Sequence, residues 1–177
     1  MNKVPAKPGG LLFLDLSLHT GWVYGGREHI AAPGPLWGKF NIDEPTLGKR
    51  MFALDCELSD LIHRYNPGKV GIEAPLRVVK NRSGHAAELL FCLAGQSEAT
   101  CVRWEKPFFK SEFDKTRNAV LGRRHMNDLE TAAGLTVKSA IVAPWVERMG
   151  WDIPDEDARD AAVGWAFEMG IRYRGLK

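Results

Sequence analysis

Uninterrupted apolar runs and helically spaced apolar positions divide this chain into two kinds of segment. Short runs that are apolar throughout, or rich in aromatic and β-branched residues, are typical of strands in a buried sheet. The sequence predicts such strands at 11–15, 21–25, 36–42, 69–74 and 100–104. Turn residues at 17–21 and 32–35 separate the first three strands closely, so we expect an antiparallel meander there.

Helical spacing dominates the rest of the chain. Over 47–65 the apolar side chains recur along one helical face, and Asn66-Pro67-Gly68 ends the segment. Further helices are predicted at 84–98, 110–121, 128–148 and 155–169. Gly134 and Pro144 weaken the helix at 128–148 and can break it in two, whereas Asp155 is a suitable N-cap for the last helix.

The order of these segments predicts an α/β fold. A helix lies between the third and fourth strands and another between the fourth and fifth, which requires parallel pairs beside the meander. We therefore expect a mixed five-stranded sheet with helices on both faces. At 177 residues the chain has room for one core, and we expect a single domain over 1–177 with a flexible lead-in at 1–10.

Composition excludes several broad classes of protein. An apolar fraction of 45% is too high for a disordered chain, and no apolar run approaches the roughly 20 residues of a membrane span. The first residues lack the apolar stretch of a signal peptide, so we expect a cytoplasmic protein with no membrane partner. Cys56, Cys92 and Cys101 lack a C-x-x-C spacing, which predicts reduced thiols.

Four acidic residues stand where a metal-dependent nuclease requires them. Asp15 directly follows the apolar run of the first strand, and Glu73 has the same place in the fourth. Asp157 and Asp160 lie beside the apolar stripe of the last helix. As alternatives, Asp15 can start a turn, and the two helical aspartates can favour the helix dipole. A glutamate at the end of a buried strand is harder to explain without a partner or a metal.

Together these carboxylates predict a site for two Mg²⁺ ions, for which Mn²⁺ is expected to substitute. Clustered carboxylates repel one another, and divalent cations relieve that repulsion. Two ions about 4 Å apart can clamp a scissile phosphate, one lowering the pKa of the attacking water and the other neutralising the leaving 3′-oxygen. We expect Asp15 to bridge the ions and Asp157 to complete one coordination shell. Glu73 and Asp160 would favour opposite ions.

The positions of the charged residues say more about a binding partner than the net charge does. The chain has 24 basic and 22 acidic residues, a formal net charge of +2. Two basic clusters are predicted to contact DNA phosphates, namely Arg77, Lys80 and Arg82 in the first, and Arg117, Arg123 and Arg124 in the second. Ordinary solvated charge is the alternative for either cluster on its own.

Three short motifs become specific when their order and separation are considered together. They are Phe13-Leu14-Asp15 with Thr20-Gly21-Trp22 after a gap, Val70-Gly71-Ile72-Glu73-Ala74-Pro75, and Asp157-Ala158-Arg159-Asp160-Ala161. This series, over most of the chain, resembles the RuvC family of Holliday junction resolvases within the ribonuclease-H-like fold. The resemblance implies that fold, and a homodimer that resolves four-way DNA junctions by paired, Mg²⁺-dependent nicks leaving 5′-phosphates.

The same resemblance assigns two basic residues and marks two departures. Lys138 stands where the family has a lysine near the metals, with a plain surface lysine as the alternative. Arg117 resembles a basic position before the family's glycine, where it would hold backbone phosphates. Leu16-Ser17 replaces the Pro-Gly that often follows the first aspartate, and Arg123-Arg124-His125 replaces a glycine-rich stretch. These departures fit a divergent, phage-type branch and put junction selectivity in doubt.

Other functions stay open. The nearest is another nuclease of the same fold that acts on branched DNA or RNA–DNA hybrids, and a non-catalytic DNA-binding component is a third class. A proofreading exonuclease fits less well because Ser17 occupies the third place of its Asp-x-Glu motif, and an actin-like sugar kinase needs two domains. Four aromatic residues are interpreted as core or interface in preference to a base-stacking wedge, namely Phe91, Trp104, Phe108 and Phe109.

Overall fold

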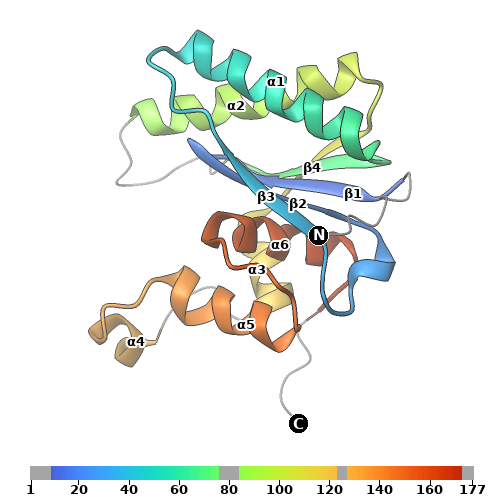
Figure 1. The fold of residues 1–177 in the computed structure, drawn as a ribbon. Helices are drawn as coiled ribbons and strands as arrows, with labels where there is room; N and C mark the ends of the chain where they lie inside the picture. Colours follow the sequence, from blue (N-terminus) through green and yellow to red (C-terminus); the bar gives the residue numbers. More distant parts are fainter. Residues whose placement is uncertain (1–8, 76–83, 123–126, 173–177) are drawn as a thin grey trace.

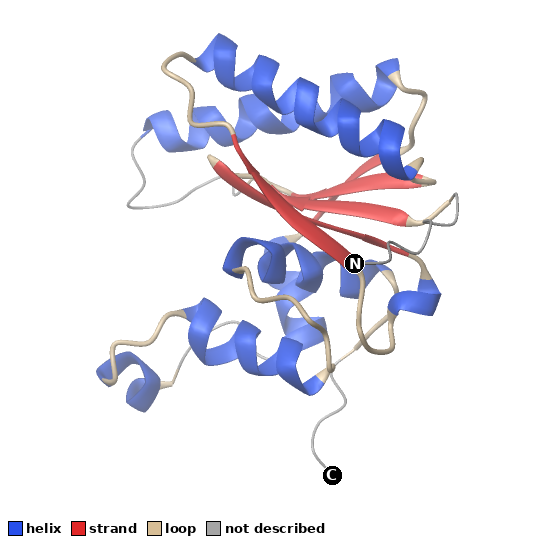
Figure 2. Cartoon of the chain, in the orientation of Figure 1, coloured by secondary structure: helices blue, strands red, loops and turns tan. Residues whose placement is uncertain are grey.

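One sheet lies between two layers of helices in the computed structural model, which describes residues 9–75, 84–122 and 127–172 (Figure 1). The covering helices are α1 (Leu47–Tyr65) and α2 (Gly84–Arg103) on one face, and α3 (Phe113–Leu121) and α6 (Glu156–Glu168) on the other, with α5 (Ala143–Arg148) packed against α6. Figure 2 shows the strands as one layer between the helices. The predicted α/β fold with helices on both faces is confirmed.

Within the described residues, five strands form the sheet in the order β3-β2-β1-β4-β5. They are β1 (Leu11–Asp15), β2 (His19–Gly25), β3 (Leu36–Asn41), β4 (Lys69–Glu73) and β5 (Phe108–Ser111). Strands β1 to β3 are antiparallel, whereas β1, β4 and β5 run parallel. The predicted meander and its parallel neighbours are therefore confirmed, and β1 and β4 end at the same edge of the sheet.

Alternation along β1 builds a core on each side of the sheet. Leu12 and Leu14 face the core under α1 and α2. Phe13 faces the core under α6, where Trp151 and Trp165 pack edge to face with ring centroids 5.6 Å apart. Because both faces are covered by helices, β1 is apolar at every position before its terminal aspartate.

Side chains and turns fix the ends of the helices. Thr46 Oγ1 accepts the backbone N–H of Lys49 at the start of α1, and Asn66 ends that helix in the left-handed region with φ of 45°. Asp155 Oδ1 accepts two backbone N–H groups at the start of α6, each at 3.1 Å. The predicted N-cap role of Asp155 is confirmed.

The predicted strand at 100–104 was wrong, because these residues form the end of α2 and the turn that follows it. Thr100 donates its hydroxyl to the carbonyl of Gln96 at 2.9 Å, a local bond that accommodates a β-branched residue in a helix. Cys101 lies in the same core as Leu93. The last strand is β5, and α3 accordingly begins later than the predicted residue 110. A short apolar window does not distinguish a buried helical turn from a strand.

The segment predicted as one weakened helix at 128–148 is divided. Helix α4 (Asp128–Ala132) ends before Gly134, which has φ of 70°. A π-helix, η2 (Lys138–Val142), then runs directly into α5. The sequence predicted the break but not the π-helical geometry.

Helix α6 and the sheet approach each other closely at two glycines. A Cβ atom at Gly21 of β2 would lie 2.1 Å from the backbone carbonyl carbon of Asp157. A Cβ atom at Gly164 of α6 would lie 2.1 Å from the ring of Phe13. Neither position leaves space for a side chain, so glycine at these two sites lets α6 rest directly on the sheet.

Helix length and the state of the cysteines complete the description of the fold. No helix within the described ranges is long and apolar enough to cross a membrane. Cys56, Cys92 and Cys101 are free thiols, and Cys101 is buried while Cys56 is exposed.

Candidate active site

The edge where β1 and β4 end carries the first two predicted metal ligands. Asp15 and Glu73 are the last residues of these strands, and both are partly buried. Helix α6 passes over the same edge and adds Asp157 and Asp160. Asp15 experiences the charges of both helical aspartates, and Glu73 those of Asp15 and Asp160. The structure therefore brings the four predicted acids into one electrostatic site.

Two basic side chains hold the aspartates of α6. Lys138 Nζ, on η2, lies 2.7 Å from Asp157 Oδ1 and 3.1 Å from Asp160 Oδ2. Arg117 Nη2, on α3, lies 2.8 Å from Asp160 Oδ1. The Asp160 side chain is only 3% exposed and that of Arg117 only 8%, so their ion pair is buried. Five elements, β1, β4, α3, η2 and α6, thus contribute charged side chains to this edge.

Burial and mutual repulsion alter the acid–base behaviour of the strand-borne acids. Burial, followed by the charge of Asp160, raises the pKa of Asp15 from 3.8 to about 7. Burial, followed by the charge of Asp15, raises the pKa of Glu73 from 4.5 to about 8. For Lys138, burial lowers the pKa, but the bonds and charges of Asp157 and Asp160 outweigh it and the net pKa is raised. The ammonium therefore stays protonated.

The chemistry of these donors fits Mg²⁺. All four are carboxylates, the hard oxygen ligands that Mg²⁺ prefers. Burial, and after it the repulsion between acids, raises the pKa values of Asp15 and Glu73, and a cation would offset both effects. Within the described ranges, no group of three or more His, Cys, Asp or Glu side chains is spaced to hold an ion. To bind an ion, Asp157 and Asp160 would exchange contacts with Lys138 and Arg117 for contacts with the ion.

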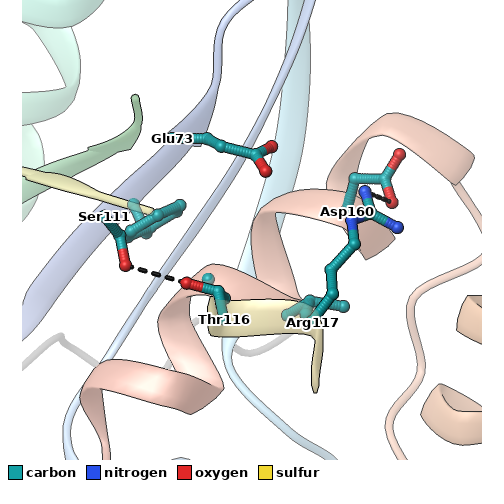
Figure 3. Close-up of a pocket in the computed structure, with 8 residues that line it drawn as sticks. Glu73, Ser111, Thr116, Arg117 and Asp160 are labelled. Atoms are coloured by element: carbon teal, nitrogen blue, oxygen red, sulfur yellow. Dashed lines mark hydrogen bonds and ion pairs between the residues drawn. The ribbon is translucent and has the colours of Figure 1, made fainter. Parts of the chain in front are cut away.

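A small pocket opens between β4, β5, α3 and α6. In Figure 3 the Glu73 carboxylate points across this pocket toward the Asp160–Arg117 ion pair. The residues that line the pocket are Phe13, Glu73, Ser111, Thr116, Arg117, Asp160, Val163 and Gly164. The pocket therefore lies between Glu73 on β4 and Asp160 on α6.

Sequence reasoning missed two hydroxyl residues of this pocket. Ser111 Oγ and Thr116 Oγ1 lie 3.0 Å apart, and Ser111 Oγ also lies 3.3 Å from Glu168 Oε1. Ser111 is paired with Glu73 across the β4–β5 ladder, at the same edge as the acids. A strand placed correctly at 108–111 would have indicated Ser111, because its last residue reaches this edge.

The structure places only one predicted DNA-contacting residue. Arg117, which the sequence predicts to contact DNA phosphates, is buried inside the site and pairs with Asp160. Its contact with phosphate stays a prediction. The other predicted contacts lie outside the described residues, namely Arg77, Lys80, Arg82, Arg123 and Arg124.

Most of the predicted aromatic positions are structural. Phe108 and Phe109 pack against the cores on opposite faces of the sheet. Trp104 donates its indole N–H to Ser59 Oγ at 3.0 Å and so joins α2 to α1. Phe91 is exposed on α2. The interpretation as core or interface residues is confirmed for Phe108 and Phe109.

Solved structures share this fold over most of its length. No protein-family model matches the chain, and neither does any curated protein. The chain is similar to T. thermophilus RuvC in complex with a Holliday junction substrate, with 16% identity, a TM-score of 0.63, and 93% of this chain and 98% of that chain covered. A further Thermus thermophilus RuvC structure gives 18% identity, a TM-score of 0.58, and coverage of 92% and 98%.

A yeast structure extends this likeness to a second organism. The yeast mitochondrial Holliday junction resolvase Ydc2 gives 12% identity, a TM-score of 0.54, and coverage of 96% of this chain and 82% of that chain. At such identities the likeness concerns the fold. The mixed sheet, its strand order and its two helical layers therefore identify the chain as having the ribonuclease-H-like fold of the RuvC-type resolvases.

Proposed function

We propose that this chain is a metal-dependent, structure-specific endodeoxyribonuclease that resolves four-way DNA junctions by paired nicks, leaving 5′-phosphates. The observation that carries the proposal is the meeting of Asp15, Glu73 and Asp160 at one edge of this sheet. One similar structure, T. thermophilus RuvC, is in complex with a Holliday junction substrate. Branched DNA is therefore the substrate that we propose.

The proposed metal ligands are Asp15, Glu73, Asp157 and Asp160. Two Mg²⁺ ions, or Mn²⁺ in their place, would supply a water of lowered pKa and neutralise the leaving 3′-oxygen. Strands β1 and β4 hold Asp15 and Glu73 on a hydrogen-bonded sheet, which is a rigid support for a site. The raised pKa values of both acids support the proposal, because a bound cation would favour their ionised forms.

Lys138 is proposed to act on the phosphate. Its ammonium group lies at the edge that carries the acids, and its raised pKa keeps it charged. A fixed positive charge there would stabilise the negative charge that develops on the phosphate in the transition state. Arg117 neutralises Asp160 from the protein interior, while the predicted phosphate contacts of the two basic clusters remain proposals.

A homodimer is proposed, with α2 as the contact surface. Phe91, Gly95, Ala99 and Val102 follow one exposed face of α2 at helical spacing. Phe91 is 49% exposed and Val102 is 72% exposed, and a Cβ at Gly95 would meet nothing within 4 Å. Two such faces can pack closely about a two-fold axis, and a two-fold enzyme suits a two-fold junction.

A cleavage panel tests the proposed reaction. Purified protein is incubated with a mobile four-way junction, a flap, a linear duplex and an RNA–DNA hybrid, in Mg²⁺ and in EDTA. We expect symmetric paired nicks with ligatable 5′-phosphate ends on the junction alone, and no product in EDTA. Cleavage of the hybrid or flap in preference to the junction would indicate another nuclease of this fold. Junction binding without any cleavage would indicate a non-catalytic DNA-binding component.

A further inference from the structure

The position of Lys138 depends on an unusual segment of backbone. Lysine has a flexible side chain with four carbons, so its ammonium is only as well placed as the backbone that carries it. Lys138 is the first residue of the π-helix η2, and its side chain is 35% exposed. It nevertheless contacts both Asp157 and Asp160. The backbone around Lys138 must therefore direct the side chain toward these aspartates.

Two hydroxyl residues flank Lys138 and bind each other. The backbone N–H of Thr136 donates to Ser139 Oγ at 2.9 Å, and the backbone N–H of Ser139 donates to Thr136 Oγ1 at 3.1 Å. Ser139 Oγ also donates to the Thr136 carbonyl at 3.1 Å. This reciprocal arrangement is a capping box built from two hydroxyls. It fixes the backbone on both sides of Lys138.

The wide helical turn that follows has a cause in the sequence. The backbone N–H of Ala143 donates to the carbonyl of Lys138, which is the i→i+5 bond of a π-helix. Pro144 follows directly, and in an α-helix its ring would clash with the carbonyl of Ala140. A turn with one extra residue avoids that clash. It also rotates Lys138 by about 100° relative to the buried face of α5, compared with a continuous α-helix.

We propose that Thr136 and Ser139, together with the π-turn before Pro144, are positioning residues that aim Lys138 at the paired aspartates. The role in cleavage rests on the proposed function, whereas the role in placing the ammonium does not. The two hydroxyls act through the backbone and touch no substrate. An ordinary helix cap would stabilise the helix without changing the surroundings of the Lys138 amine, so the two roles can be separated by measurement.

Amine labelling tests the placement without reference to cleavage. Metal-free protein is acetylated briefly with an N-hydroxysuccinimide ester, and the labelling rate of each lysine is measured by mass spectrometry. In the double variant Thr136→Val with Ser139→Ala, we expect Lys138 to be labelled roughly three- to tenfold faster, since loss of a helix cap alters local populations on that scale. The single variant Ser139→Thr keeps the hydroxyl, so Lys138 should be labelled as slowly as in the wild type. Thr131→Ala, which removes a hydroxyl from α4 instead, should leave the rate unchanged.

A second variant tests the wide turn itself. Pro144→Ala removes the clash and permits an α-helical turn, so we expect faster labelling of Lys138 with circular dichroism close to that of the wild type. The single-turnover rate of junction cleavage at saturating protein should fall in both the double variant and Pro144→Ala. The affinity of both proteins for the junction should stay unchanged. Labelling rates equal to wild type in folded double and Pro144→Ala variants would overturn the proposal. If the wild-type protein cuts no junction, the proposed function fails, and labelling still decides the placement.

Discussion

At the scale of single residues, the site is a balance between buried acids and two cations. Burial raises the pKa values of Asp15 and Glu73, and the charge of Asp160 adds to the shift of Asp15 while that of Asp15 adds to the shift of Glu73. Asp160, in contrast, forms ion pairs with Arg117 and Lys138. Lys138 and Arg117 lower the pKa of Asp15 but do not offset its burial, whereas both side chains bind Asp160 directly. Removing a charge from Asp15 or Glu73 should therefore relieve an unfavourable burial, whereas removing Arg117 should leave the charge of Asp160 uncompensated.

The strand-borne acids should make the metal-free protein less stable as pH rises. Their folded pKa values, about 7 and about 8, lie above the ordinary 3.8 and 4.5, so the folded state binds more protons between these limits. Their contribution to the free energy of unfolding is thus present below about pH 4 and lost as pH rises through about pH 8. Urea unfolding in EDTA should show a smaller decline for Asp15→Asn than for wild type. An identical pH dependence would contradict the assignment.

The Arg117–Asp160 pair should be strongly coupled. Arg117→Gln leaves a buried carboxylate with less compensation, and we expect a loss of about 3–5 kcal/mol in the free energy of unfolding. Asp160→Asn added to that variant should recover part of the loss, because the uncompensated charge is gone. Urea unfolding of the two single variants and the double variant measures this coupling. Additive losses would show that the two side chains do not act as a pair.

The proposed metal ligands should be required for cleavage but not for binding. Glu73→Gln and Asp157→Asn keep the size of each side chain and remove a charged ligand, so junction cleavage should be abolished while junction binding persists. Lys138→Ala should slow the single-turnover rate at saturating Mg²⁺ with little change in binding. Gel-shift and cleavage assays on one junction provide both quantities. Turnover in both acid variants would remove these residues from the metal site.

At the scale of elements, the close approach of α6 to β2 is the contact most sensitive to added atoms. Gly21→Ala would place a Cβ 2.1 Å from the backbone of Asp157, so α6 must move. We expect a loss of about 1–3 kcal/mol in the free energy of unfolding and weaker Mg²⁺ binding. Gly48→Ala, in open space at the start of α1, is the matched control and should be neutral or slightly stabilising. Equal effects of both changes would contradict the tight packing.

The same scale shows what sequence reasoning could and could not reach. The runs ending in Asp15 and Glu73 predicted two buried strands, because a buried strand is apolar throughout and its terminal acid stands out, whereas the pairing of these strands and their shared edge came from the structure. The fifth strand was misplaced, since Thr100 and Cys101 suit a buried helical turn as well as a strand. The role of Arg117 was also beyond the sequence, because only the packing of α3 on α6 shows that its guanidinium is buried.

At the scale of the whole molecule, the α2 face defined by Phe91, Gly95, Ala99 and Val102 should control assembly. Val102→Asp would place a charge in an apolar contact, and we expect sedimentation to show a shift from dimer to monomer. Leu135→Asp changes an exposed apolar residue outside this face and should leave the dimer intact. A monomeric wild-type protein, or a dimer unaffected by Val102→Asp, would exclude α2 as the contact.

The close contact of α6 with β2 at Gly21 bears on how far the amino-acid sequence can change while the fold is kept. A Cβ at Gly21 would meet the main chain of Asp157, so the position of Asp157 depends on the missing side chain at Gly21. Substitutions can accumulate in both hydrophobic cores while this spacing is preserved. A backbone spacing anchored in this way can persist while the rest of the sequence changes, which is in keeping with a shared fold at 16% identity.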